Sequence, residues 1–110
     1  MGVRIVTDSA CDLPEDVAAA LHIEVVPLTI RFGKEEFVDR EELDNATFWK
    51  KLRASEILPE TAAPSAGAFE TRYRKLIDRG ATGIICINLS SKLSGTMQAA
   101  QVAASAVSGD

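Results

Sequence analysis

The fold is decided by Gly83-Ile84-Ile85-Cys86-Ile87-Asn88-Leu89, a nearly continuous apolar run. A strand whose two faces are both covered has this composition, whereas a half-exposed strand alternates apolar and polar residues. The run therefore predicts a central strand of a parallel sheet, which places the chain among α/β proteins.

Helices and strands are expected to alternate around this run. Immediately before it, Ser65 can cap a helix with apolar residues at helical spacing, and Gly80 can end that helix. The other expected elements are a strand over 3–7, a helix from Pro14, a strand over 23–32, a hairpin turn at 33–34 into a strand over 36–38, a helix capped by Asp44, a loop over 55–65 and a helix over 95–107. This order predicts one α/β layered domain over residues 1–110, with a mainly parallel sheet flanked by helices.

The composition argues against several classes of partner. The chain has 110 residues and a net charge of −4, and its basic residues are scattered, unlike those of nucleic-acid-binding surfaces. No apolar run reaches the roughly 18 residues of a membrane span, and the N-terminus lacks a signal-peptide pattern. Cys11 and Cys86 stand in no metal or redox spacing. We therefore expect a cytoplasmic protein with no nucleic-acid partner, no membrane span, no metal and no cofactor.

Two loops carry hydroxyl side chains into helix starts, Thr61-Ala62-Ala63-Pro64-Ser65 and Ser90-Ser91-Lys92-Leu93-Ser94-Gly95-Thr96. The helices expected after Pro14 and Asp44 begin with carboxylates of their own, but these two helix starts have no acid in the first turn. Their unpaired backbone N–H groups and positive dipole ends are open to a foreign anion. Because ligands of α/β sheets bind beyond the carboxyl ends of strands, both loops are expected to form one small anion-headgroup site.

These residues alone leave the nature of the anion open. Ser65 and Ser94 can also be explained as plain N-caps that bind no ligand. A phosphate is less suitable, because there is no G-x-x-x-x-G-K pattern and Lys92 is the only basic residue in either loop. A neutral cluster of hydroxyls suits a single carboxylate better.

An ordered set of motifs is similar to a known family. The set consists of Thr7-Asp8-Ser9 with Asp12-Leu13-Pro14, Val25-Val26-Pro27-Leu28, Asp39, Thr61-x-x-Pro64-Ser65, and Ser90-Ser91-x-Leu93-Ser94-Gly95-Thr96-x-Gln98-x-Ala100. Together these motifs resemble the DegV family of bacterial fatty-acid-binding proteins (FakB-like), in the right order along nearly the whole chain. Each motif is weak alone, whereas the ordered set is specific.

The resemblance implies a function for the two loops. In that family a long-chain fatty acid is buried with its carboxylate held by hydroxyls of these loops, so Thr61 and Ser94 are the expected headgroup contacts. The expected supporting residues are Ser65, Ser90, Gly95 and Thr96. A partner fatty-acid kinase phosphorylates the bound carboxylate, so the resemblance implies a protein that presents the acid and is not itself an enzyme.

The resemblance also concerns the extent of the fold. Family members are considerably longer, so residues 1–110 are expected to be an N-terminal DegV-like domain, truncated relative to the two-domain family fold. The second domain, which closes over the ligand in the family, is expected to be absent. One departure is local: the usual Ser-Gln after the threonine is Ala62-Ala63 here, which removes polar groups beside the headgroup.

Two other functions remain as alternatives. A serine hydrolase or transferase would use Ser94, but the chain lacks G-x-S-x-G, and nothing in the spacing brings the only histidine, His22, to Ser94. The second alternative is an interaction fragment for a kinase that binds no lipid.

Other distinctive residues have structural interpretations. Asp8 and Asp12 are expected to cap turns rather than bind a metal. His22 is expected on the surface at a helix-to-strand junction. Trp49 is expected to form a core-facing stripe together with Phe48 and Leu52.

Overall fold

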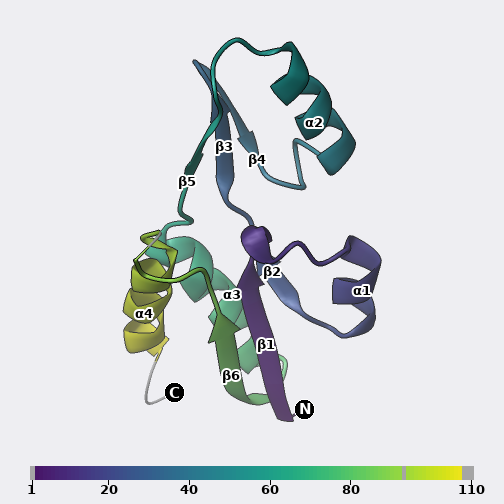
Figure 1. The fold of residues 1–110 in the computed structure, drawn as a ribbon. Coiled ribbons are helices and arrows are strands. Elements are labelled where there is room, and N and C mark those ends of the chain that lie inside the picture. Colours follow the sequence, from purple (N-terminus) through teal and green to yellow (C-terminus); the bar gives the residue numbers. More distant parts are fainter. Residues whose placement is uncertain (1, 93, 108–110) are drawn as a thin grey trace.

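The chain folds into two lobes, each built around its own sheet (Figure 1). The computed structural model describes residues 2–92 and 94–107, so Leu93 of the last motif lies outside the described residues. The parallel-sheet lobe has the strand order β2-β1-β6, and the hairpin lobe has the antiparallel order β4-β3-β5. The expected α/β fold, with a parallel sheet flanked by helices, is confirmed.

Along the chain, the elements of the hairpin lobe lie between β2 and α3 of the parallel-sheet lobe. The parallel-sheet lobe contains β1 (Gly2–Asp8), the 3-10 helix η1 (Ser9–Cys11), α1 (Glu15–Ala20), β2 (Glu24–Val26), α3 (Ala66–Asp78), β6 (Ala81–Ile87) and α4 (Thr96–Val107). The hairpin lobe contains β3 (Thr29–Phe32), β4 (Glu35–Val38), α2 (Asn45–Ala54) and β5 (Glu60–Ala62). Among the described helices, none is long and apolar enough to cross a membrane.

The main core lies between the parallel sheet and the helices α3 and α4. β1 is the central strand, with Val6 opposite Glu24 of β2 and Cys86 of β6. The buried cluster consists of Val6, Val26, Phe69, Tyr73, Leu76, Ala100, Ala103 and Val107. Three of these come from the apolar face predicted for the helix after Ser65, because residues three or four apart lie on one side of a helix.

The opposite face of the parallel sheet is largely uncovered. Ile85 and Ile87 are more than half exposed, and no described strand pairs with the outer side of β6. The prediction that Gly83–Leu89 forms a central strand buried on both faces is therefore wrong, because β6 lies at the edge of the sheet. A run of apolar residues makes burial favourable on both faces, but only the neighbouring elements decide which faces are covered.

The strand expected over 23–32 is divided between the two sheets. β2 ends at Val26 and β3 begins at Thr29, with Pro27, which has no N–H for a ladder, between them. The backbone of Leu28 is bound on both sides. Its N–H donates to Oγ of Ser9 at 2.9 Å, and its carbonyl accepts from the N–H of Asp39 at 2.8 Å. Leu28 is thus a fixed junction between the lobes.

The hairpin lobe has a small core of its own. β3 and β4 are joined at Gly33, whose φ of +61° suits a glycine in a tight turn, as expected at 33–34. The buried side chains are Ile30, Phe32 and Leu43, with Phe37 and Phe48 packed against them. Asp44 caps α2 by accepting the N–H of Thr47 at 2.7 Å, as expected.

Two expectations for the hairpin lobe are wrong. Residues 55–65 are not all loop, because Glu60–Ala62 form β5, in which Thr61 is opposite Ile30 of β3. Trp49 does not face the core: it is 54% exposed and makes a T-shaped contact with the Phe48 ring, at a centroid distance of 5.3 Å. Because this core is small, α2 has only a narrow apolar surface to pack against, and Trp49 lies outside it.

Candidate functional site

The helices α3 and α4 begin at the same edge of the parallel sheet. α4 follows the carboxyl end of β6, whereas α3 leads into the amino end of β6 and so starts at the carboxyl edge. The helices pack together, with Tyr73 Oη donating to the carbonyl of Ala100 at 3.4 Å. Figure 1 shows both helix starts below the lower end of β5. This edge is where ligands of α/β sheets bind.

Ser94 is partly buried just before α4. Its Oγ accepts the N–H of Thr96 at 3.1 Å and lies 2.8 Å from Thr96 Oγ1. Because a hydroxyl has two lone pairs and one hydrogen, Ser94 can accept both bonds and keep its own hydrogen for a ligand. Thr96 is fully buried, and its hydroxyl is bonded to that of Ser94.

Thr61 lies on β5 rather than on the expected loop. Its backbone is held in the hairpin lobe opposite Ile30, while its side chain is exposed. Its hydroxyl makes no hydrogen bond to any described residue. Three residues later Pro64 is buried, which anchors the short connection to α3. The hydroxyl of Thr61 is therefore available to a ligand.

The four supporting residues differ in their availability. Ser65 caps α3, because its Oγ accepts the backbone N–H three residues on at 3.1 Å. Ser90 holds its own loop: its carbonyl accepts the N–H of Ser94 at 3.2 Å. A Cβ placed on Gly95 would meet no atom within 4 Å, so the space beside the start of α4 is open. Ser65 is thus an N-cap and Thr96 is bonded to Ser94, while a ligand-supporting role for the four residues stays a prediction.

The two helix starts carry no acid of their own. No acidic residue lies in the first turn of α3 or α4, whereas α1 has Glu15 and Asp16 there and α2 has Asp44 at its cap. The positive ends of α3 and α4 are therefore not neutralised locally. An anion at this edge would meet hydroxyl donors and helix dipoles.

Two titratable groups interact between α3 and β6. Burial raises the pKa of the Cys86 thiol. Burial, with a further contribution from Cys86, also raises the pKa of Tyr73 well above its ordinary value. Both groups keep their protons at neutral pH, so Cys86 is not a thiolate nucleophile.

His22 does not pair with Ser94. It is exposed at the junction between α1 and β2, with a φ of 56°, and its carbonyl accepts from Nη2 of Arg4 at 2.9 Å. It therefore precedes β2 toward the amino edge of the parallel sheet, while Ser94 lies beyond the carboxyl edge. The surface position expected for His22 is confirmed.

Asp8 has a role that the sequence only partly indicates. Its Oδ1 caps η1 by accepting the N–H of Ala10 at 2.9 Å, which confirms the expected turn cap. Its Oδ2 binds Asn88 and Leu89, which follow β6. No local pattern predicts this second set of bonds, because about 80 residues separate the partners.

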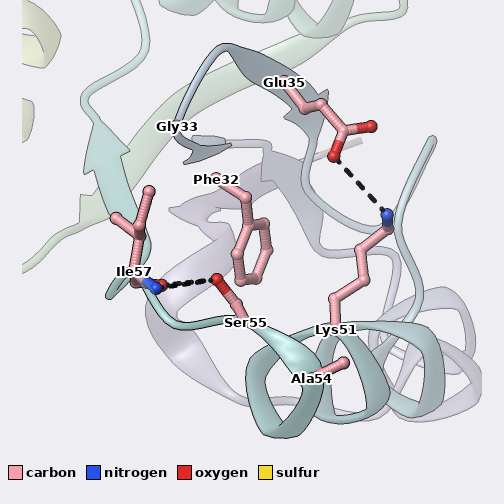
Figure 2. Close-up of a pocket in the computed structure, with 7 residues that line it drawn as sticks. All are labelled: Phe32, Gly33, Glu35, Lys51, Ala54, Ser55 and Ile57. Atoms are coloured by element: carbon pink, nitrogen blue, oxygen red, sulfur yellow. Dashed lines mark hydrogen bonds and ion pairs between the residues drawn. The ribbon is translucent and has the colours of Figure 1, made fainter.

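The surface has several hollows, which lie in both lobes. The one in Figure 2, about 280 Å³, lies between the β3–β4 turn and the end of α2 and is lined by Phe32, with Lys51 and Glu35 4.0 Å apart beside it. None of the predicted site residues lines it. A smaller one, about 140 Å³, lies at the carboxyl ends of β1 and β6 beside Asp8 and Leu89. Within the described residues, no group of three or more His, Cys, Asp or Glu could hold a metal ion.

The fold and the order of the motifs match one protein family. A family model described as an uncharacterised protein of the DegV family matches residues 2–110. The chain belongs to the DegV family. A DegV domain-containing protein of Halalkalibacterium halodurans is 42% identical over 107 residues, which are 97% of this chain and 38% of the relative. One from Listeria innocua is 37% identical with the same coverage. The chain thus spans less than two fifths of these relatives' length.

Solved structures of DegV-family proteins share this fold. A Thermus thermophilus protein described as fatty-acid-binding has a TM-score of 0.86 and 35% identity, covering 99% of this chain and 39% of its own. A Thermotoga maritima protein described as a DegV lipid-binding protein gives 0.88 and 32%, with 97% and 39% covered. DegV of Bacillus subtilis, described as a fatty-acid-binding protein, gives 0.87 and 32%, with 97% and 38% covered.

Proposed function

We propose that this chain binds a long-chain fatty acid and holds its carboxylate between the hydroxyls of Thr61 and Ser94. The observation that carries the proposal is the Ser94 hydroxyl, which can keep a donor hydrogen at the start of a helix without a first-turn acid. Thr61 supports it with a hydroxyl that has no partner among the described residues. The DegV-family proteins described as fatty-acid-binding support the choice of ligand.

A carboxylate fits this edge better than a phosphate. Two hydroxyl donors can each give one charge-assisted hydrogen bond to the two oxygens of a carboxylate. Lys92 is exposed and is the only basic residue in the two loops, which is little compensation for a doubly charged group. The matched relatives are more than twice as long as the matched region, and we propose that a second domain in them completes the enclosure of the acyl tail.

The bound acid is presented to a fatty-acid kinase rather than transformed by this chain. His22 lies away from Ser94, and burial keeps Cys86 protonated, so neither activates a nucleophile at the site. The kinase partner and a cytoplasmic location rest on the family resemblance. Mass spectrometry of lipid extracted from the purified, undenatured protein tests the proposal. Long-chain fatty acid in the extract is expected, and an extract without it would contradict lipid carriage.

Alanine variants test the two hydroxyls. Thr61→Ala and Ser94→Ala are each expected to weaken oleate binding by about 1.5–3 kcal/mol, the range for hydrogen bonds to a charged group. Thr71→Ala is the matched control, because its hydroxyl donates to the carbonyl of Gly67 on α3 at 2.9 Å. Titration calorimetry on this chain and on a full-length relative with matching substitutions measures the effect. Equal losses in the control would remove the special role of Thr61 and Ser94.

The acyl tail and the carboxylate are expected to contribute separately. Each buried methylene contributes about 0.8 kcal/mol, so the tail supplies most of the affinity. The variant lacking both Thr61 and Ser94 hydroxyls should therefore still take up lipid but place its carboxylate poorly, and phosphorylation should fall more than binding. Turnover of a chromogenic ester that disappears in Ser94→Ala would instead favour the hydrolase alternative.

A further inference from the structure

Asp8 is a buried carboxylate whose two oxygens serve different parts of the chain. It is 2% exposed and forms no ion pair with the described residues. Oδ1 accepts the N–H of Ala10 at 2.9 Å, which caps η1. Oδ2 accepts from Nδ2 of Asn88 at 3.1 Å and from the N–H of Leu89 at 3.3 Å. Three N–H donors thus compensate the burial of this group in place of a cation.

The end of β6 is fixed by side chains beyond the last ladder pair. That pair is Thr7↔Ile87, and Thr7 Oγ1 also donates to the carbonyl of Ile87 at 2.8 Å. The thiol of Cys86 donates to Oδ1 of Asn88 at 3.1 Å, which leaves the amide nitrogen of Asn88 to face Asp8. Asp8 therefore binds the segment directly after β6, where the chain leaves the sheet.

A short series of hydrogen bonds connects this point to Ser94. Leu89, held by Asp8, is followed by Ser90, whose carbonyl accepts the N–H of Ser94 at 3.2 Å. On the other side, Ser94 is bound to Thr96 at the start of α4. The position of the Ser94 hydroxyl is thus set by α4 at one end and by Asp8, through Leu89 and Ser90, at the other.

We propose that Asp8 is a positioning residue for the Ser94 hydroxyl. The effect of Asp8 on ligand binding rests on the proposed function, whereas its effect on the loop after β6 does not. A cap for η1 would need only one oxygen, and asparagine caps about as well as aspartate does. Asp8→Asn therefore separates the two roles. Its single oxygen can serve η1 or the loop, and its NH₂ group then faces another N–H donor.

Amide hydrogen exchange measured by NMR on the full chain tests the positioning role. In Asp8→Asn, the amides of Leu89 and Ser94 should exchange at least about tenfold faster than in the unmodified chain, since bonds to a charged acceptor are lost. The amides of Val6 and Tyr73 should change much less. Equal acceleration at all four positions would mean that Asp8 only stabilises the fold, and would overturn the proposal.

Asp12→Asn is the matched control for Asp8→Asn. Asp12 is exposed, lies four residues away and has a φ of 58°, a backbone conformation that asparagine tolerates. Asp12→Asn removes one carboxylate, as Asp8→Asn does, and should leave the exchange rates of the Leu89 and Ser94 amides unchanged. If Asp8→Asn does not fold, Asn88→Ala decides, because it removes the Nδ2 donor, one of the two that Oδ2 accepts, and leaves the cap of η1 intact. It should accelerate exchange at Leu89 and Ser94, and unchanged rates there would overturn the proposal.

A titration with sodium octanoate separates this proposal from the proposed function. Octanoate carries the same headgroup and dissolves at millimolar concentration, so weak binding can be followed by the amide shifts of Ser94 and Thr96. Asp8→Asn should need about tenfold more octanoate than the unmodified chain or Asp12→Asn. Equal affinity in Asp8→Asn would overturn the positioning role. If the unmodified chain shows no shifts, the proposed function fails, while the exchange rates still decide the role of Asp8 in the loop.

Discussion

The two lobes differ in how much they bury, and the proposed site takes one hydroxyl from each. The parallel-sheet lobe has a continuous core that includes two helices and two strands, whereas the hairpin lobe buries only Ile30, Phe32 and Leu43. Local opening in proteins favours regions with few buried apolar contacts. Ser94 therefore stands beside the more stable lobe, and Thr61 on the strand of the less stable one. Binding at the proposed site therefore depends on the weaker lobe staying folded.

The largest expected effect comes from a matched pair of leucines. Leu76 is 1% exposed in the main core and Leu43 is 2% exposed in the hairpin lobe. Leu76→Ala should lower the free energy of unfolding by about 3–5 kcal/mol, and Leu43→Ala by about 2–3 kcal/mol, because the smaller core has less packing to lose. Urea unfolding followed by circular dichroism measures both. A larger loss from Leu43→Ala would reverse the ranking of the lobes.

Trp49 allows the lobes to be followed separately. It is the only tryptophan and lies on α2 of the hairpin lobe. In Leu43→Ala, the fluorescence of Trp49 should change at lower urea concentration than the circular dichroism signal, since non-coincident transitions indicate that one part opens first. Coincident transitions would show that the two lobes unfold as one unit.

A smaller effect is expected from the ion pairs that tie strands to their neighbours. Glu24 of β2 is 16% exposed and binds Lys75 at 2.7 Å and Arg72 at 3.1 Å. Burial acts to raise its pKa, but Lys75 and Arg72 together outweigh burial, so the pKa of Glu24 lies below its ordinary value. In the hairpin lobe, Glu60 pairs with Arg31 on an exposed surface.

The two ion pairs should respond differently to substitution and pH. Glu24→Gln should cost about 1 kcal/mol of stability at neutral pH, and Glu60→Gln less than about 0.5 kcal/mol. Because the folded-state pKa of Glu24 is lowered, its contribution is present above the ordinary value of 4.5 and is lost as pH falls through the folded-state pKa. Thermal unfolding measured from pH 7 to pH 3 should show the stability of Glu24→Gln converging with that of the unmodified chain as the pH falls. A constant difference between the two would contradict the assignment.

The smallest effects are expected at exposed apolar side chains, one in each lobe. Trp49→Gln and Ile85→Thr should each change stability by no more than about 0.5 kcal/mol, because both residues are more than half exposed. Threonine keeps the β-branched shape that suits β6. A loss above about 1 kcal/mol in Ile85→Thr would mean that this face of the sheet is covered in solution.

The sequence predicted what depends on local pattern. The alternation of strands and helices, the caps Asp44 and Ser65 and the apolar face of α3 all follow from spacing and residue type over a few positions. The acid-free starts of α3 and α4 were predictable for the same reason. These features need no knowledge of what lies across the sheet.

Features that depend on distant partners were not predictable. The edge position of β6 depends on which strands pair with it, and the strand at Thr61 depends on pairing with Ile30 of β3. The exposure of Trp49 depends on the size of the core beneath α2. The bonds from Asp8 to Asn88 cross 80 residues. Each of these features depends on a contact between residues far apart in the sequence, which no short window of sequence contains.

The two covalent crossings between the lobes have a mechanical consequence. They lie at residues 27–28 and 63–65. A rigid body attached at two points can turn only about the line through them, and an atom's travel grows with its distance from that line. The turn between β3 and β4, at the far end of the hairpin lobe (Figure 1), would move further than Thr61, which is two residues from the second crossing. Arg40 donates to the carbonyls of Leu13 and Ser9 at 2.8 and 3.2 Å and so restricts this rotation. The hydroxyl of Thr61, the proposed headgroup contact, lies near the rotation axis of the smaller lobe.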